Sequence, residues 1–316
     1  MKKKEAEDIL NIIEKYSTIV ISRHRNPDPD CIGSQITLRN IIKKKYPKKN
    51  VYAVGMKAAH LKYLGPLDEL TDINSKKALA IILDTPDKKR VDSINVEEYA
   101  YSIKIDHHPF DHKYCDYEVI DSSASSVCEM ILKLCTLLGI TLSEEDSERL
   151  YTGVVSDTER FLQSYTNDKT FKSAAKLIEN PDVDINKIYN NLYLRPIHDY
   201  RIMSYIYNNV KITENGFAYI KLPRRWLEHN NVNTQIVGKI ANCLNYIEEI
   251  IAWCIITEEP NELRLSLRSR GPVINEIAKK YGGGGHKYIS GVSLKTEKEV
   301  KNIIKDLDNN CKEYEG

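Results

Sequence analysis

Histidine and aspartate residues follow several apolar runs of this chain and could together bind metal ions. The candidate ligands come after the run 18–22 (TIVIS), the run 78–83 (ALAIIL), the alternating run 101–105 and the helical or apolar run 152–156: His24, Asp28, Asp30, Asp84, His107 and Asp157. Imidazole and carboxylate groups are common ligands of divalent cations, and paired cations activate water against phosphoesters. The grouping therefore predicts metal-dependent phosphate chemistry.

Each motif also has a simpler interpretation when it is taken alone. Asp28 and Asp30 alternate with two prolines and could form a turn and a helix cap before Gly33, and Asp84 could be a turn residue before Thr85. Asp157 could be a surface or capping residue. Turns do not readily explain three successive strand ends that carry acids or histidines, because ligands bind at the carboxyl ends of parallel strands.

The charges of the candidate ligands suit two divalent cations. Four carboxylates and two neutral imidazoles carry a formal charge of −4. Oxygen and imidazole ligands without thiolate favour Mn²⁺ or Mg²⁺, with Co²⁺ or Zn²⁺ as alternatives, and we expect Mn²⁺. In a site with two ions roughly 3.5–4 Å apart, a bridging water is acidified to hydroxide and the leaving oxygen is stabilised. We therefore expect phosphoester hydrolysis.

The elements that must position these residues read as an α/β fold. Strands are predicted at 18–22, 51–54, 78–83 and 101–105, with helical periodicity at 33–45 and 124–138, so we expect a parallel sheet with helices on both faces. The pattern of apolar and polar residues changes after residue 180, where a predicted helical stretch at 186–208 precedes predicted strands at 217–222, 250–256 and 263–267. We predict a catalytic domain at 1–186, a helical linker at 187–209 and a smaller α/β domain at 210–316.

Composition narrows the class of protein. The 316 residues include 46 basic and 45 acidic side chains, and a net charge of +1 excludes a protein that coats long nucleic acid through many phosphate contacts. Seven cysteines without a CxxC pair indicate neither a zinc ribbon nor a disulfide framework. Neither a membrane-length apolar run nor a signal-peptide core is present, so we expect a cytoplasmic protein without a membrane partner.

The order and spacing of the motifs resemble the DHH phosphoesterase superfamily. The match comprises His24-x3-Asp28-x-Asp30, Asp84, Asp106-His107-His108, Asp157 and Gly282-Gly283-Gly284-Gly285-His286. More narrowly, the chain is similar over nearly its whole length to DHH–DHHA1 proteins of the bacterial nanoRNase and pAp phosphatase type. This resemblance implies a DHH catalytic domain joined to a DHHA1 substrate-binding domain.

The resemblance also implies a role for each residue of the first domain. His24 and Asp28 would hold one metal ion, and Asp30, His107 and Asp157 the other. Asp84 would bridge the two ions. His108 would contact the scissile phosphate, and Asp106 would orient a histidine.

The glycine run and two arginines would bind substrate in the second domain. Gly282, Gly283, Gly284 and Gly285 with His286 could form a flexible linker or an ordered loop that cradles phosphate, and the resemblance implies that this loop grips the nucleotide across an interdomain cleft. Arg268 and Arg270 could be solvated strand residues, or could contact phosphate or base. The residues at 287–291, with Glu159, Pro29 and Cys31, depart from the family pattern.

The function expected from these observations is that of a manganese-dependent phosphodiesterase or exoribonuclease. Its substrates would be very short RNA or DNA oligonucleotides and nucleotides, with 3′-phosphoadenosine 5′-phosphate as a further substrate. The alternatives are an inorganic pyrophosphatase of the same superfamily, a nucleotide receptor without catalysis, and an RNA-binding accessory module. The polarity of attack, the use of cyclic dinucleotides and the oligomeric state stay open, and a homodimer is compatible with the sequence.

Overall fold

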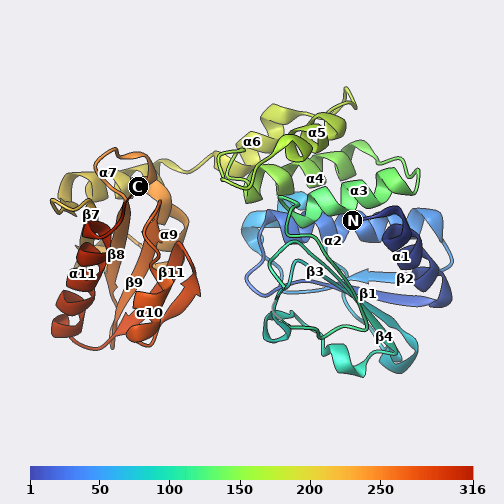
Figure 1. Cartoon of the computed structure of the whole chain (residues 1–316), viewed down its shortest axis with the longest axis horizontal. Coiled ribbons are helices and arrows are strands. Elements are labelled where there is room, and N and C mark those ends of the chain that lie inside the picture. Colours follow the sequence, from blue (N-terminus) through green and yellow to red (C-terminus); the bar gives the residue numbers. More distant parts are fainter. Residues whose placement is uncertain (111, 316) are drawn as a thin grey trace. The chain divides into compact units, whose positions relative to one another are not determined.

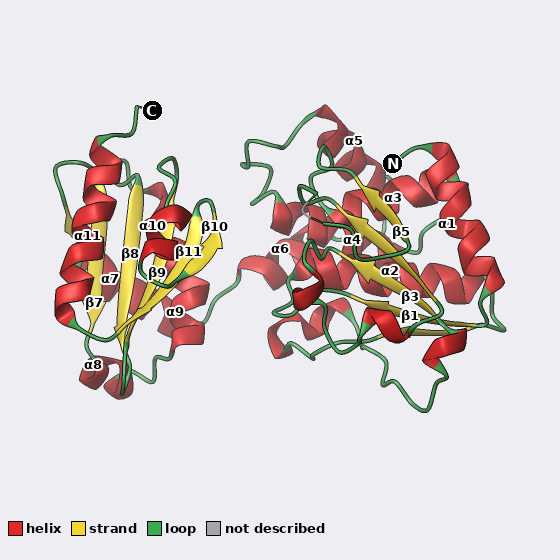
Figure 2. Cartoon of the chain, turned by 60° about the horizontal axis from the view of Figure 1, so that its bottom comes forward, coloured by secondary structure: helices red, strands yellow, loops and turns green. Residues whose placement is uncertain are grey.

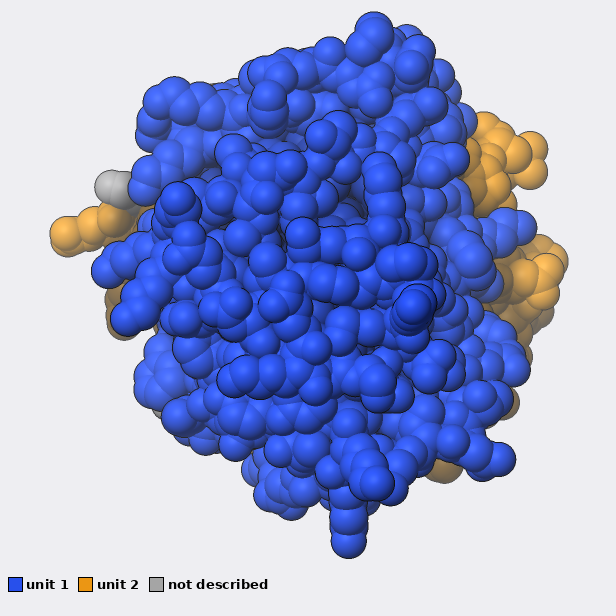
Figure 3. Space-filling view, turned by 90° about the vertical axis from the view of Figure 1, so that its right-hand side faces the viewer, with its two compact units in different colours: residues 1–194 blue, residues 195–316 orange. Residues whose placement is uncertain are grey.

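The computed structural model describes residues 1–110 and 112–315, except for the side chains of Gln235 and His286. The chain forms two compact units, Met1–Leu194 (unit 1) and Arg195–Gly316 (unit 2), which Figure 3 distinguishes by colour. The stretch predicted as a helical linker, 187–209, contains the end of helix α6 (Ile185–Tyr193) and all of helix α7 (Ile197–Asn209).

Unit 1 contains a five-stranded parallel sheet. Its strands are β1 (Thr18–Ser22), β2 (Asn50–Ala53), β3 (Leu79–Leu83), β4 (Tyr101–Asp106) and β5 (Tyr117–Ile120), in the order β2-β1-β3-β4-β5. The central strand β3 is buried throughout, as continuous apolar runs in parallel sheets usually are. The strand order reverses between β1 and β3, and this switch point is where open α/β sheets bind ligands.

Helices cover both faces of this sheet, as the sequence predicts. One face shares its core with six α-helices: α1 (Lys3–Lys15), α2 (Pro29–Lys45), α3 (Val127–Leu137), α4 (Glu144–Asp157), α5 (Asp168–Leu177) and α6. Figure 2 shows these helices around the strands. On the other face, Ala80 and Ile82 pack against Val91 and Val96, next to the short 3-10 helices η3 (Lys88–Arg90) and η4 (Val96–Glu98). Two further 3-10 helices, η1 (Ala59–Leu64) and η2 (Ser75–Lys77), lie in the connection before β3.

Unit 2 contains a mixed six-stranded sheet. Its strands are β6 (Lys211–Ile212), β7 (Phe217–Leu222), β8 (Ala252–Glu258), β9 (Leu263–Ser269), β10 (Gly284–His286) and β11 (Ile289–Leu294), in the order β10-β11-β9-β8-β7-β6. Strands β7 and β8 pair in parallel, and the other neighbours pair antiparallel.

The helices of unit 2 also lie on both sides of its sheet (Figure 1). Helices α10 (Asn275–Lys280) and α11 (Glu297–Lys312) pack on one face. Helices α7, α8 (Arg224–His229) and α9 (Thr234–Ile240), with the 3-10 helix η5 (Ala241–Tyr246), pack on the other. None of the described helices in either unit is long and apolar enough to cross a membrane.

Candidate metal centre

The loop after β1 brings His24 to the switch point of the unit 1 sheet. The His24 Nδ1 atom donates to the carbonyl oxygen of Arg25 over 2.8 Å, which assigns the proton of the neutral ring to Nδ1. The Nε2 atom lies 3.3 Å from an oxygen of Asp28 and 3.3 Å from an oxygen of Asp84. A neutral imidazole held in this way presents a lone pair at Nε2, the form that binds metal ions.

A buried ion pair stabilises the loop that carries His24. The Arg23 guanidinium donates to the Asp92 carboxylate over 2.8 Å and to the carbonyl oxygen of His24 over 2.9 Å. Both partners are almost completely buried. The ion pair therefore fixes the backbone that carries His24.

Asp28 and Asp30 are held by the first residues of two helices. Asp28 is the N-cap of α2, and its Oδ1 atom accepts from the amide of Cys31 over 3.0 Å. The Asp30 carboxylate accepts from the amides of Val127 and Cys128, each over 2.7 Å, at the N-terminus of α3. Exposed amides at a helix N-terminus favour an anion, so α3 orients the Asp30 carboxylate.

Asp84 lies at the middle of the candidate centre, directly after β3. Its φ of +52° is in the left-handed region, where a residue with a side chain is strained by about 1–2 kcal/mol. The Asp84 side chain is buried, and its Oδ1 atom lies 3.5 Å from Nε2 of His107 and 3.4 Å from Nδ1 of His108. Strain of this kind persists at sites where the surrounding structure fixes a functional side chain.

The two histidines after β4 have different partners. Nε2 of His107 lies between the carboxylates of Asp84 and Asp157, 3.5 and 3.3 Å away. Nδ1 of His108 lies 2.9 Å from Oδ1 of Asp106, which also accepts from the His108 amide over 3.2 Å. His107 thus faces the carboxylate cluster, whereas Asp106 fixes the orientation of the His108 ring.

A buried lysine that the sequence motifs do not include lies next to Asp106. Lys104 Nζ lies 3.7 Å from Oδ2 of Asp106, donates to the carbonyl oxygen of Pro86 over 3.3 Å and lies 4.6 Å from the centroid of the Tyr114 ring. The Tyr114 hydroxyl in turn donates to the carbonyl oxygen of Thr85. Residues two apart on a strand point to the same face, so Lys104 and Asp106 lie on one side of β4. A charged residue two positions before Asp106 could therefore have been recognised in the sequence as a partner of this carboxylate.

Asp157 is the last residue of α4 and reaches the centre because Gly153 lets this helix approach closely. A Cβ atom on Gly153 would lie 2.3 Å from Sγ of Cys128 and 2.9 Å from Oδ1 of Asp30. The Tyr165 hydroxyl donates to the carbonyl oxygen of Asp157 over 2.7 Å. The residues 159–161 that follow all have φ between 45° and 67°, although none is glycine. A strained left-handed turn therefore follows Asp157.

The buried carboxylates of the centre crowd one another electrostatically. Burial and the charge of Asp84 raise the pKa of Asp30 to about 6, and burial and the charge of Asp30 raise the pKa of Asp157. Burial alone would raise the pKa of Asp84, but the nearby imidazole rings of His107 and His24 lower it. The cluster therefore stabilises positive charge.

Two buried oxygens of the centre fit a metal ion in particular. Oδ1 of Asp84 and Oδ2 of Asp157 have no hydrogen-bond partner within the described residues. Buried polar atoms nearly always have a partner, and a cation would provide one. Three groups of side chains have ligand atoms within 4.8 Å of one another: His24, Asp28, Cys31 and Asp84; Asp84, His107 and His108; Asp30, His107 and Asp157. The structure thus brings all six predicted ligands together, with Asp84 shared by two groups, and this donor set suits a divalent metal.

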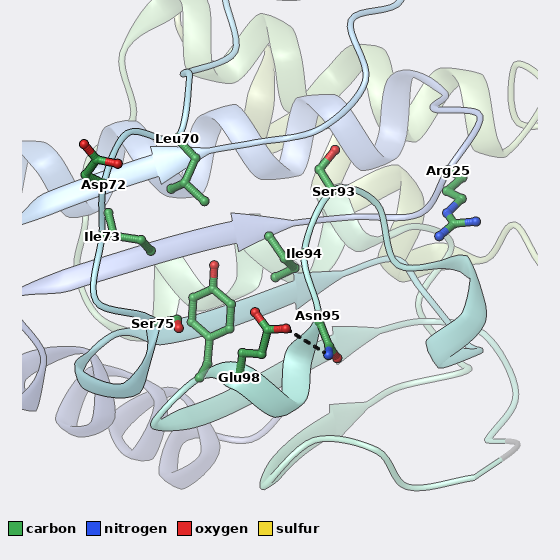
Figure 4. A pocket seen from close by; sticks show the side chains of 10 residues that line it. Arg25, Leu70, Asp72, Ile73, Ser75, Ser93, Ile94, Asn95 and Glu98 are labelled. Atoms are coloured by element: carbon green, nitrogen blue, oxygen red, sulfur yellow. Dashed lines mark hydrogen bonds between the residues drawn. The ribbon is translucent and has the colours of Figure 1, made fainter.

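A hollow of about 520 Å³ lies beside the loop that carries His24 (Figure 4). Arg25 lines it at one end, and Ser75 and Tyr99 belong to segments that precede β3 and β4. Asn95 and Glu98 are hydrogen-bonded across its wall over 3.2 Å. Because none of the six candidate ligands lines it, the hollow is separate from the metal centre.

The glycine run of unit 2 differs from the loop that the sequence predicts. The Gly282 amide donates to the carbonyl oxygen of Lys279 over 3.0 Å, and the Gly283 amide donates to the carbonyl oxygen of Ala278 over 2.9 Å. These two bonds form the Schellman pattern that ends α10. Gly284 and Gly285 pair with β11 in strand β10. Each half of the run therefore has a role in the fold. The side chain of His286 lies outside the described residues.

The two predicted substrate arginines already have protein partners. The Arg268 guanidinium donates to Oδ1 of Asn242 over 3.1 Å and to the carbonyl oxygen of Leu267 over 2.9 Å. The Arg270 guanidinium donates to three carbonyl oxygens in the turn 247–250. Both side chains therefore fasten local structure, and their contact with substrate stays a prediction.

Known proteins resemble this chain along its whole length. The DHH family N-terminal domain matches residues 18–155, and the DHHA1 domain matches residues 214–313. The bifunctional oligoribonuclease and PAP phosphatase NrnA of Bacillus subtilis is 38% identical, over 98% of this chain and 99% of the relative. The probable bifunctional oligoribonuclease and PAP phosphatase NrnA of Streptococcus mutans is 34% identical, over 95% of this chain and 97% of the relative.

A solved structure has the same fold. The exopolyphosphatase-related protein from Bacteroides fragilis superimposes with a TM-score of 0.86 at 23% identity, over 99% of this chain and 98% of that one. At this identity the likeness establishes the fold and no more. Together with the two domain matches and the full-length relatives, it confirms the predicted fold class and the resemblance. The chain belongs to the DHH–DHHA1 family of phosphoester hydrolases.

Proposed function

We propose that this hydrolase is a Mn²⁺-dependent phosphodiesterase that cleaves very short oligonucleotides, such as linear pApA, to mononucleotides. As part of this proposal it also converts 3′-phosphoadenosine 5′-phosphate to AMP, and it acts in the cytoplasm. The observation that carries the proposal is the gathering of six candidate ligands, two of which, Asp84 and Asp157, have a buried carboxylate oxygen without a hydrogen-bond partner among the described residues. The names of the B. subtilis and S. mutans relatives support the choice of substrate.

The side chains of unit 1 divide the chemistry between them in this proposal. His24 and Asp28 would hold one ion, Asp30, His107 and Asp157 would hold the other, and Asp84 would serve both. The two ions would supply a hydroxide nucleophile and neutralise charge on the leaving oxygen. The His108 ring, fixed by its 2.9 Å contact with Asp106, donates to the scissile phosphate.

Unit 2 binds the nucleotide in this proposal. Arg268, Arg270 and His286 contact phosphate or base, and the backbone of Gly282–Gly285 lies against the substrate without side chains in the way. Gly284 leaves room for this use, because a Cβ atom there would meet nothing within 4 Å. Arg270 already donates to three carbonyl oxygens, so we expect Arg268 to contribute more to binding.

The proposal is tested by a substrate panel with metal-depleted protein. We expect hydrolysis of pApA and of 3′-phosphoadenosine 5′-phosphate only after Mn²⁺ is restored, and no hydrolysis by Asp84→Asn. Cleavage of inorganic pyrophosphate alone would replace the proposal with the pyrophosphatase alternative. Binding of pApA without any product would indicate a receptor instead of an enzyme.

The role of unit 2 is tested by two arginines of the same strand. Arg268→Ala and His286→Ala should raise KM for pApA, whereas Arg264→Ala on the same strand β9 should not. Equal KM values for Arg268→Ala and Arg264→Ala would contradict the substrate contact assigned to Arg268.

A further inference from the structure

A sulfur atom lies in the first group of candidate ligands. The Sγ atom of Cys31 and one ligand atom each of His24, Asp28 and Asp84 all lie within 4.8 Å of one another. The Cys31 side chain is completely buried. This group therefore offers one nitrogen, two oxygens and one sulfur, which is a softer donor set than the carboxylates and imidazoles alone.

The start of α2 holds this sulfur in place. Cys31 occupies the third helical position after the N-cap Asp28, where a glutamate commonly reaches back to the N-cap amide. Here Sγ lies 3.3 Å from the amide nitrogen of Asp28 and 3.3 Å from its carbonyl oxygen. The Cys31 side chain thus points back toward the loop that carries His24 and Asp28.

A second feature of the group indicates a bound cation. Asp84 is 2% exposed, and its Oδ1 atom has no hydrogen-bond partner within the described part of the chain. Its other oxygen lies 3.3 Å from Nε2 of His24. An anionic side chain buried in this way needs a positive partner, and the sulfur lies in the same group.

We propose that Cys31 is a fourth protein ligand at this position for thiophilic divalent ions, so that the site binds Zn²⁺ and Cd²⁺ through His24, Asp28, Asp84 and sulfur. The inference rests on the metal centre of the proposed function. A lone pair on sulfur forms the new bond to the ion, and the thiol proton leaves to solvent. Mn²⁺ prefers oxygen and imidazole and leaves the thiol in its capping contacts.

Closing the site with a fourth protein ligand has a functional consequence. Tetrahedral zinc sites with four protein ligands are structural, whereas catalytic ones keep a position for water. Zn²⁺ and Cd²⁺ therefore act as inhibitors that compete with Mn²⁺. Cys31 makes the enzyme sensitive to the balance between these two classes of ion.

Cys128 provides a matched control. It is another buried thiol, and its Sγ atom contacts the carbonyl oxygen of Asp30 over 3.4 Å, as Cys31 contacts Asp28. Cys128 belongs to none of the ligand groups found among the described residues. A role in helix packing alone would apply to both cysteines, whereas metal binding would apply to Cys31 only.

The test is a Cd²⁺ titration of the metal-free full-length chain, followed through the sulfur-to-metal charge-transfer absorption in the ultraviolet. We expect a band that saturates in wild type and in Cys128→Ala but is absent in Cys31→Ala and Cys31→Ser. The serine variant keeps the capping geometry, and circular dichroism shows whether each variant is folded. Zn²⁺ binding to Cys31→Ser should weaken by about tenfold or more, while Mn²⁺ binding is retained.

Three results would overturn the proposal. Wild type that binds Mn²⁺ but gives no charge-transfer band would remove sulfur from the site and leave the proposed function intact. A band that persists in both Cys31 variants would assign it to another thiol. Wild type that binds neither Mn²⁺ nor Cd²⁺ would refute the metal centre itself, and with it both proposals.

Discussion

Gly153 of α4 is where one methyl group should disturb the metal centre most directly. The Cβ atom of an alanine there would lie 2.3 Å from Sγ of Cys128, 2.9 Å from Oδ1 of Asp30 and 3.0 Å from Cα of Asp30. Ordinary contacts between nonbonded heavy atoms are about 3.5–4.0 Å. In Gly153→Ala, α4 or the Asp30 backbone must therefore move.

The size of the effect follows from two opposing terms. Overpacking a buried site costs about 1–3 kcal/mol, and the upper end applies because Asp30 backbone is among the atoms contacted. Alanine in place of glycine within a helix restores about 1 kcal/mol. We expect a net loss of about 2 kcal/mol in the free energy of unfolding. Mn²⁺ affinity should fall about ten- to a hundredfold, because the Asp30 carboxylate leaves its two amide donors.

Gly238 of α9 is the control for this substitution. A Cβ atom on Gly238 would meet nothing within 4 Å, so Gly238→Ala should stabilise unit 2 by up to about 1 kcal/mol and leave metal binding unchanged. Urea denaturation monitored by circular dichroism and Mn²⁺ titration measure the two quantities. If Gly153→Ala binds Mn²⁺ as tightly as wild type, the assignment of Asp30 as a metal ligand is wrong.

Three further predictions concern the Lys104–Asp106 pair, the histidines His107 and His108, and the Asp68 carboxylate. Lys104→Met should lower the free energy of unfolding by about 3 kcal/mol in urea, because Asp106 loses its buried cation, and Asp106→Asn in the same chain should restore part of this. His107→Ala should lower the bound Mn²⁺ measured by elemental analysis, whereas His108→Ala should keep the metal and slow turnover on pApA by about a hundredfold or more. Burial alone would raise the pKa of Asp68, but the hydrogen bond from the Ala53 amide and the nearby cations lower it. The stabilisation that the ionised Asp68 carboxylate gives the fold is therefore present above about pH 4 and is lost as the pH falls below that value. The stability difference between wild type and Asp68→Asn should therefore shrink in acid, and an unchanged difference at low pH would contradict this.

The parallel sheet could be predicted from the sequence because its inner strands are either largely apolar runs, as in β1 and β3, or alternate apolar and polar residues, as in β4. The predicted strands at 18–22 and 101–105 agree with β1 and β4 to within one residue. Strand β5 was missed because it is a short edge strand of four residues with one buried position. Such a strand contacts one neighbour and needs little apolar surface.

The glycine run of unit 2 shows where a composition signal fails. Four consecutive glycines predicted a loop, yet the structure uses two to end α10 and two to form β10. Gly282 has φ of +76°, which glycine adopts readily. A Cβ atom on Gly285 would lie 2.4 Å from the carbonyl oxygen of Ile289, so a side chain there would strain the β10–β11 pairing.

The neighbours of the candidate ligands were harder to predict than the ligands themselves. The candidate ligands follow segments that the sequence pattern identifies as strands or a helix. It could therefore be predicted that these side chains meet at one edge of the sheet. The helix predicted at 33–45 was expected to begin at Gly33, but α2 begins at Pro29. Cys31 lies before that predicted start, so its position three residues after an N-cap, which directs the sulfur toward Asp28, was not apparent.

The distribution of the six proposed ligands along the chain has a consequence for biosynthesis. All of them lie between His24 and Asp157, and all of unit 1 precedes Arg195. Domains generally fold as units during translation, with the N-terminal one first. The proposed metal centre can therefore assemble while the ribosome is still making the part of the chain that is proposed to bind nucleotide.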